Sequence, residues 1–279
     1  MHSSPPDRDQ PHNLHEGAIT CTDSHGPPPR PCAPSRSRSP PRWPDAGGDT
    51  SSTEASADLA AFCDDGITLD QAFQNFNSDD PEVFEVQLSA AVPVTDRIVA
   101  AAPAELDDEY AVMAEAFSTV VETGDPTPFF TPDVQAASDA AHAYDLAHCD
   151  WSVVDITSED FRFAGTFPSE AGATSFEMAN TGAEAHALIV GRKLDTVEAS
   201  ALDAFNALES EDAFPSSFEQ TAMVFAEPGQ SGYALADLTP GEYIAFCPVP
   251  SGTTSETAPG DGPPHFTQGM VDSYDVPEP

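Results

Sequence analysis

The chain has 279 residues, of which 39% are hydrophobic, so it is long enough for about two domains with ordinary cores. Its 48 acidic residues far outnumber its 9 basic ones, which gives a net charge of -39 at pH 7. This charge repels polyanions and so excludes nucleic acid and anionic membrane surfaces as partners, while leaving open whether the acidity serves life in salt or only solubility.

Residues 1–55 are rich in Pro, Ser, Arg and Gly and lack the periodicity of a helix or a strand, so we expect a disordered leader or linker. They hold no apolar core of a signal peptide, and no run of about 18 apolar residues predicts a membrane span anywhere in the chain. Taken alone, this indicates a cytoplasmic protein. The stretch GGDTSSTEAS, however, resembles the tether that follows the lipid-anchored Cys of bacterial surface lipoproteins. We therefore expect a different true start, with lipid anchoring as one outcome, and an extracellular or cell-envelope location.

Residues 56–150 have the period of helices. An acidic N-cap candidate and Pro81 precede apolar residues four apart, and Gly124 is a plausible C-terminal stop for the next helix. Thr131 and Pro132 open a third clear helix, which runs toward Cys149. The pattern predicts a small helical bundle domain.

Two cysteines, Cys63 and Cys149, lie near the two ends of this predicted bundle. A disulfide between them would contribute about 4 kcal/mol to stability, and the alternative is two buried free thiols. His142 and His148 are six residues apart, which is not the spacing of metal ligands on one helical face, so we interpret them as surface or interface residues.

After Cys149 the period changes to that of strands, with turn residues at short intervals, which predicts an antiparallel sandwich over 151–279. The stretch TVEASALDAFNALES has helical spacing and predicts a helical insertion in it. The fold class is therefore α+β and multidomain, with a leader at 1–55, a helical domain at 56–150 and an all-β domain at 151–279.

Four residues of this last domain are candidate metal ligands: His186, Cys247, His265 and Met270. Soft sulfur ligands together with imidazole select copper, and a His-Cys-His plane with a weak axial Met suits one-electron transfer. Each also has a structural interpretation, in which the histidines serve turns or loops and the Met fills a core. The thiol of Cys247 is harder to explain in this way, because it is unpaired if Cys63 bonds Cys149 and if Cys21 and Cys32 belong to the leader.

Three motifs carry a family resemblance. NTGAEAH resembles the first-histidine turn of plastocyanin-like cupredoxins, PGEYIAFC their cysteine strand, and HFTQGMVDSYDV their closing His-x4-Met segment. The whole chain resembles a two-domain group of secreted actinobacterial proteins. The resemblance implies a Greek-key sandwich and one type 1 copper ion held by His186, Cys247, His265 and Met270. In a typical cupredoxin the last three ligands share one short loop, whereas here the segment 248–264 intervenes, and we expect it to be flexible.

The functional hypothesis is an extracytoplasmic copper protein that transfers single electrons or handles copper, with a redox protein or a copper donor or acceptor as partner. Phe246 and Phe266 are expected to keep water from the metal. The alternative is a metal-free binding or structural module of the cell envelope. We expect no enzyme, since the sequence has no GxSxG elbow, HExxH helix or phosphate-binding loop.

Overall fold

The computed structural model describes residues 51–76, 80–255 and 257–278, which belong to one compact unit, Gly48–Pro279. Most of the predicted leader, with Cys21 and Cys32, lies outside the described residues. The first helix begins at Ser51, ahead of the boundary expected near residue 56. The division into a helical domain and a sandwich domain stays a prediction, because both lie in the same compact unit.

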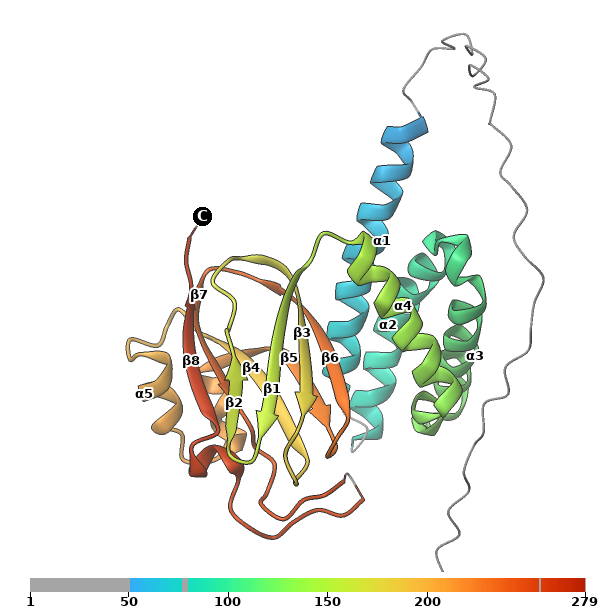
Figure 1. The fold of residues 1–279 in the computed structure, drawn as a ribbon. Helices are drawn as coiled ribbons and strands as arrows, with labels where there is room; N and C mark the ends of the chain where they lie inside the picture. The colour runs from blue at the N-terminus through green and yellow to red at the C-terminus, as the bar shows by residue number, and fades with distance from the viewer. Residues whose placement is uncertain (1–50, 77–79, 256, 279) are drawn as a thin grey trace, which may run out of the picture. The chain divides into compact units, whose positions relative to one another are not determined.

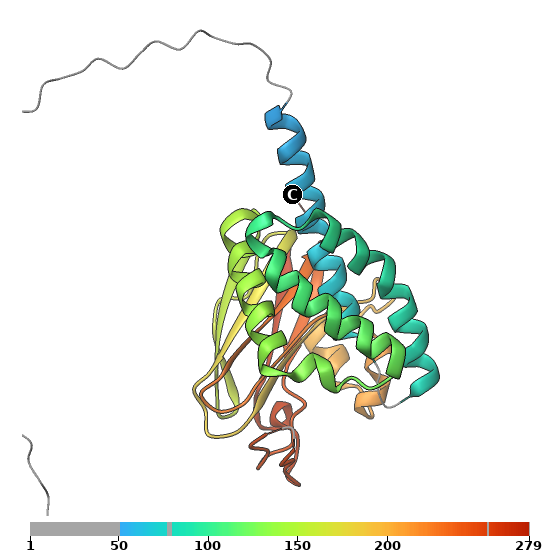
Figure 2. The ribbon, with the colours of Figure 1, turned by 90° about the vertical axis from the view of Figure 1, so that its right-hand side faces the viewer.

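The predicted helical region is confirmed, and Figures 1 and 2 show its four long helices. They are α1 (Ser51–Gln74), α2 (Pro81–Ala101), α3 (Asp107–Thr123) and α4 (Pro132–His148), with two 3-10 turns, η1 (Ala104–Leu106) and η2 (Thr127–Phe130). Asp80 caps α2 by accepting the amide hydrogens of Glu82 and Val83. Gly124, at a φ of 70°, ends α3 in the left-handed conformation that favours glycine.

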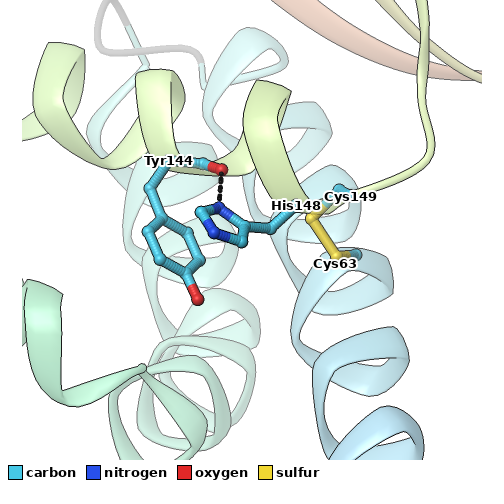
Figure 3. The surroundings of a disulfide bond; sticks show 4 residues. All are labelled: Cys63, Tyr144, His148 and Cys149. Carbon is cyan, nitrogen blue, oxygen red and sulfur yellow. Dashed lines mark hydrogen bonds between the residues drawn. A yellow bond between two sulfur atoms is a disulfide. The ribbon is translucent and has the colours of Figure 1, made fainter. Parts of the chain in front are cut away.

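The predicted disulfide is also confirmed. Cys63 of α1 bonds Cys149, the residue that follows α4, as Figure 3 shows. Beside it, the His148 ring stacks on Tyr144 and its Nδ1 lies 2.8 Å from the Tyr144 carbonyl oxygen. Two buried apolar clusters fill the bundle, one around Phe62 and the disulfide and the other around Phe117. The cross-link therefore joins the first and last helices beside one of these clusters.

The β region is a sandwich of two four-stranded sheets (Figure 1). The first sheet has the order β2-β1-β3-β6, built from β1 (Ser152–Glu159), β2 (Arg162–Gly165), β3 (Gly172–Asn180) and β6 (Ser231–Leu238). The second has the order β5-β4-β7-β8, built from β4 (His186–Lys193), β5 (Phe218–Ala226), β7 (Gly241–Phe246) and β8 (Val271–Val276). The main core lies between the two sheets and includes Ile156, Phe176, Leu188 and Tyr243.

The predicted sandwich is confirmed, but its antiparallel pairing fails at one strand pair. β1 and β3 run parallel, whereas every other pair among the named strands is antiparallel. The hairpin β1–β2 reverses the chain, and the connection after β2 returns it to the opposite side of β1, so that β3 takes the direction of β1. Turn signals indicate that a strand ends, but they do not say which neighbour the next strand will join.

The predicted helical insertion is confirmed as a short helix, α5 (Ala201–Asn206), whose N-cap is Ser200, followed by the 3-10 helix η3 (Glu211–Ser216). Phe205 of α5 packs with Ile244 and Phe246 on the face of β7 that points away from the sandwich core. This insertion therefore covers the outer face of the second sheet.

The helices contact the sandwich through α1 and α4. Asp70 of α1 accepts the Leu235 amide of β6 at 2.7 Å, and Gln74 accepts the Met223 amide of β5 at 2.6 Å. Both are edge strands of their sheets, so α1 covers edges that would otherwise present open hydrogen-bonding groups. The interface interpretation of His142 is confirmed, because its ring lies against Tyr233 of β6. Within the part of the chain that is described, no helix is both long and apolar enough to cross a bilayer.

Candidate metal centre

The four candidate ligands lie at one end of the second sheet. His186 is the first residue of β4, and Cys247 directly follows β7. Since β4 and β7 are antiparallel, the start of one strand and the end of the other meet at the same edge. His265 opens the 3-10 helix η4 (His265–Gln268), and Met270 directly precedes β8, which is antiparallel to β7. All four side chains are buried, each with 0% relative exposure.

Three donor atoms converge on one point. The His186 Nδ1 and His265 Nδ1 atoms are 3.0 Å apart, and the Cys247 Sγ lies 3.4 Å from His265 Nδ1 and 4.0 Å from His186 Nδ1. Among the described residues, these three form the one group of His, Cys or acidic side chains with the spacing of a metal site. Three of the four sequence-predicted ligands are thus brought together.

Backbone hydrogen bonds hold Met270, the fourth candidate ligand, next to His265 and Cys247. Its amide donates to the His265 carbonyl at 3.2 Å, and its carbonyl accepts the Cys247 amide at 3.1 Å. The side chain packs in the apolar cluster that contains Cys247, Ala187 and Val249. These contacts hold a buried thioether beside the thiol.

Hydrogen bonds around the site favour free lone pairs on His265 Nδ1 and Cys247 Sγ, directed at the point where the donor atoms meet. His265 Nε2 donates to the carboxylate of Glu184 at 3.0 Å, so its Nδ1 presents a lone pair to the other two donor atoms. The Ala187 amide donates to Cys247 Sγ at 3.3 Å, which favours negative charge on sulfur. Burial nonetheless raises the pKa of the Cys247 thiol to about 11, so that without a cation it keeps its proton.

The His186 ring presents Nδ1 to the other two donor atoms and Nε2 to the outer side of the site. Burial, with the neighbouring His265, lowers the pKa of His186, so its ring is neutral and fit to bind a metal. Its outer atom, Nε2, is buried and finds no hydrogen-bond partner among the described residues, although Asp160 Oδ1 lies 3.5 Å away. A Cβ on Gly182 would lie 2.8 Å from Nε2, so only glycine leaves room there. Two imidazoles, a thiol and a thioether around one dry point fit a single type 1 copper ion.

The segment 248–264, which was expected to be flexible, is closed at its base. The His265 amide donates to the Val249 carbonyl at 3.0 Å, and Pro250 and Pro264 form an antiparallel bridge. Further in, the Ser251 amide donates to the Pro263 carbonyl and the Gly262 amide donates back to Ser251. The extra chain leaves and returns at one place, so its length does not separate Cys247 from His265.

The predicted shielding by Phe246 and Phe266 is wrong in detail. Their rings pack on Phe205 of α5, in a cluster distinct from the one that holds the sulfur atoms. The aromatic residues packed beside Cys247 and Met270 are instead Phe163 and Phe225. Strand alternation explains the error, because Phe246 precedes Cys247 and so faces the opposite side of the sheet.

Two further residues of the site were not anticipated from the sequence. Glu184 bonds His265, and it lies within the NTGAEAH motif itself, two residues before His186. The rings of Phe161 and His265 make a T-shaped contact, with their centroids 5.2 Å apart. Its φ of 67° makes it the one non-glycine residue with positive φ in the described part of the chain. Such strain at the β1–β2 turn was not readable from residue type.

A scan against models of protein families finds none that matches, and a search of the curated proteins finds no similar sequence. Among solved structures, the chain is similar to reduced auracyanin from Roseiflexus castenholzii, with 18% identity, 46% of this chain and 98% of that chain covered, and a TM-score of 0.30. It is also similar to auracyanin A, a "blue" copper protein from Chloroflexus aurantiacus, with 17% identity, coverages of 44% and 97%, and a TM-score of 0.30. The McoA multicopper oxidase of Aquifex aeolicus matches at 13% identity over 47% of this chain and 30% of its own, with a TM-score of 0.26. At these TM-scores, the assignment of the site rests on its own geometry.

Proposed function

We propose that this protein is an extracytoplasmic electron carrier with one type 1 copper site. His186, Cys247 and His265 would form the ligand plane, and Met270 the weak axial position. The observation that carries the proposal is the convergence of two Nδ1 atoms and one Sγ within 4.0 Å of one another in a fully buried pocket. When bound, copper supplies a one-electron couple that the side chains of this chain lack.

The residues around the site favour electron transfer over copper delivery. All four ligands are buried, so a partner protein cannot reach them for ligand exchange without opening the fold. An electron needs no such opening. The buried His265 ring is connected to the surface by its hydrogen bond to Glu184, whose side chain is 23% exposed. A rigid, dry set of donors also limits rearrangement between the two oxidation states.

The same enclosure supports a carrier rather than an enzyme. Catalytic metal sites keep a position open for water or substrate. Here four side chains surround the point, and Phe161 and Glu184 cover the outer edge of His265. The partner would be a redox protein with a basic surface, since the net charge of -39 attracts cationic proteins and repels anionic ones.

The location outside the cytoplasm is supported by the bond between Cys63 and Cys149. Disulfides persist in oxidising compartments and are rare in the cytosol of mesophiles. In such a compartment the buried thiol of Cys247 would remain reduced only when protected by burial or by a metal.

A titration of the full-length protein with Cu(II), followed by visible absorption and paramagnetic resonance, tests this proposal. We expect an intense thiolate-to-copper charge-transfer band that saturates at one ion per chain. Cys247→Ser, which keeps the size of the side chain, should fold normally and lack the band. A wild-type protein that stays colourless and leaves the metal unbound would contradict the proposal and favour the metal-free envelope module.

A further inference from the structure

One carboxylate oxygen of Glu184 makes two hydrogen bonds that connect separate parts of the site. Oε2 accepts Nε2–H of His265 at 3.0 Å and the amide hydrogen of Gly252 at 2.6 Å. Gly252 belongs to the segment 248–264, which separates Cys247 from His265 in the chain. The same atom therefore contacts a ligand ring and the inserted segment.

Glu184 is itself held firmly. Its carbonyl accepts Nδ2–H of Asn180 at 2.8 Å, and its amide lies 3.4 Å from Oδ1 of Asp160. The next amide, that of Ala185, donates to the carbonyl of Thr253 at 2.8 Å. The turn between β3 and β4 is thus pinned from two sides and also bonded to the inserted segment. A side chain on so fixed a backbone is suited to position its neighbours.

We propose that Glu184 is a positioning residue that orients His265 for metal binding and closes the segment 248–264 against the site. This inference rests on the proposed function and assigns a residue that the ligand set does not include. The carboxylate accepts a hydrogen bond from Nε2–H and so keeps the proton on Nε2, which leaves the lone pair of the neutral His265 ring on Nδ1, toward Cys247 Sγ at 3.4 Å. In the other tautomer, Nδ1 would carry a hydrogen at the point where the three donor atoms meet.

The bond to Gly252 compensates for the unusual length of the segment. The segment has its own internal contacts, since Thr253 Oγ1 donates to the Pro250 carbonyl and accepts the Gly260 amide. These contacts fold the segment on itself, whereas the bond from Gly252 to Glu184 attaches it to the turn that carries His186. Loss of the Glu184 side chain should therefore loosen the segment at Gly252, while the bond from the Ala185 amide to the Thr253 carbonyl remains.

The test uses metal-free, full-length protein, with nitrogen-15 NMR of the histidine side chains. We expect His265 to be protonated at Nε2 in the wild type and to become a mixture of tautomers in Glu184→Ala. Glu184→Gln keeps an oxygen acceptor without the charge and should restore the wild-type tautomer in large part. Glu198→Ala removes an exposed acidic side chain elsewhere and is the matched control for charge. The same samples report the hydrogen exchange of the Gly252 amide, which should become at least about tenfold faster in Glu184→Ala.

Metal affinity provides a second measurement. The affinity for Cu(II) and for Co(II) should fall about 10- to 100-fold in Glu184→Ala, as it does when partners of metal-bound imidazoles are removed, and should recover partly in Glu184→Gln. A His265 tautomer and a Gly252 exchange rate that stay as in the wild type in Glu184→Ala would overturn the inference. If both change while the wild type binds no copper, the positioning role is upheld and the proposed electron-carrier function fails.

Discussion

Two regions of this molecule contain the same pair of side chains, a buried histidine bonded to a glutamate, in very different settings. At the helix–sandwich interface, His142 Nε2 lies 2.7 Å from Glu177. At the end of the second sheet, His265 Nε2 lies 3.0 Å from Glu184. Both histidines are buried, and each has an aromatic neighbour. The pair alone therefore does not make a metal site.

The difference lies at the other ring nitrogen. Nδ1 of His142 finds no hydrogen-bond partner among the described residues, and its ring stacks on Tyr233 with the centroids 3.5 Å apart. Nδ1 of His265 faces a second imidazole and a thiol. In both pairs the carboxylate orients the imidazole ring. Only at His265 does the other ring nitrogen meet further donor atoms, so only there can the orientation serve metal binding.

The largest expected effect comes from removing the converging nitrogen. His265→Ala should weaken Cu(II) affinity on the order of 100-fold or more, because one of a few ligands that share the binding free energy is lost. His142→Ala is the matched change in the other region and should leave the affinity within about twofold. Isothermal titration of both variants measures this, and equal losses in the two would contradict the assignment of the site.

The disulfide should produce the next largest effect, confined to stability. Removing the bond with the double change Cys63→Ser and Cys149→Ser should lower the free energy of unfolding by about 4 kcal/mol, since the unfolded chain regains the freedom of a long loop. Denaturant unfolding followed by circular dichroism measures it. Chemical reduction of the wild type is the control and should reproduce the shift, while copper binding by the folded variant should persist.

The interface should also respond to pH through Asp145, one turn beyond His142 on α4. Burial raises the pKa of Asp145 to about 7, and its Oδ1 has no hydrogen-bond partner within the described residues. Between about pH 4 and pH 7 the folded state binds more protons at this group than the unfolded state, so stability falls as pH rises. Asp145→Asn should remove this slope and stabilise the protein by on the order of 2 kcal/mol at pH 8. Thermal unfolding of the wild type and of Asp145→Asn at pH 5 and pH 8 measures this. The same loss of stability between the two pH values in both proteins would contradict the prediction.

The smallest effect is expected from the interface carboxylate. Glu177→Gln should destabilise the fold by about 1 kcal/mol at pH 7, because one charged hydrogen bond to His142 becomes neutral. The pKa of Glu177 lies below its usual value of 4.5, since hydrogen bonds from His142 and Ser175 outweigh the effect of burial. The stabilisation it gives is therefore present above pH 4.5 and is lost as the pH falls below that value. The copper affinity of the Glu177→Gln variant should equal that of the wild type. An affinity loss comparable to that of Glu184→Ala would show that the two pairs are not functionally distinct.

Local pattern was sufficient to place the ligands. Alternation in β7 puts Tyr243, Ala245 and Cys247 on one face, and the structure has the first two in the sandwich core. The polar motif NTGAEAH precedes the apolar run of β4, a pattern that indicates an end of the sheet for His186, and the strand indeed begins at this residue. Both inferences depend only on the period of a strand and on neighbours in the chain.

What the sequence did not reveal depends on contacts between distant segments. Glu184 was visible in its motif, but its role needs Gly252 and His265, which come near it only through the closed base of the inserted segment. Phe246 was expected to shield the metal, but strand alternation turns it to the opposite face of the sheet, where α5 covers it. In both cases residue type and spacing indicate which way a side chain faces, whereas tertiary packing determines which residue it contacts.

The disulfide has a mechanical consequence. Cys63 lies in the first helix, and Cys149 is separated from the start of β1 by only two residues. A pulling force that enters through the chain before Cys63 crosses the sulfur bridge and passes almost directly into the sandwich. The segment between the two cysteines, which includes the end of α1 and all of α2, α3 and α4, is a covalently closed side loop that carries no tension. Under load, the strands would yield before the helices between the cysteines were stretched.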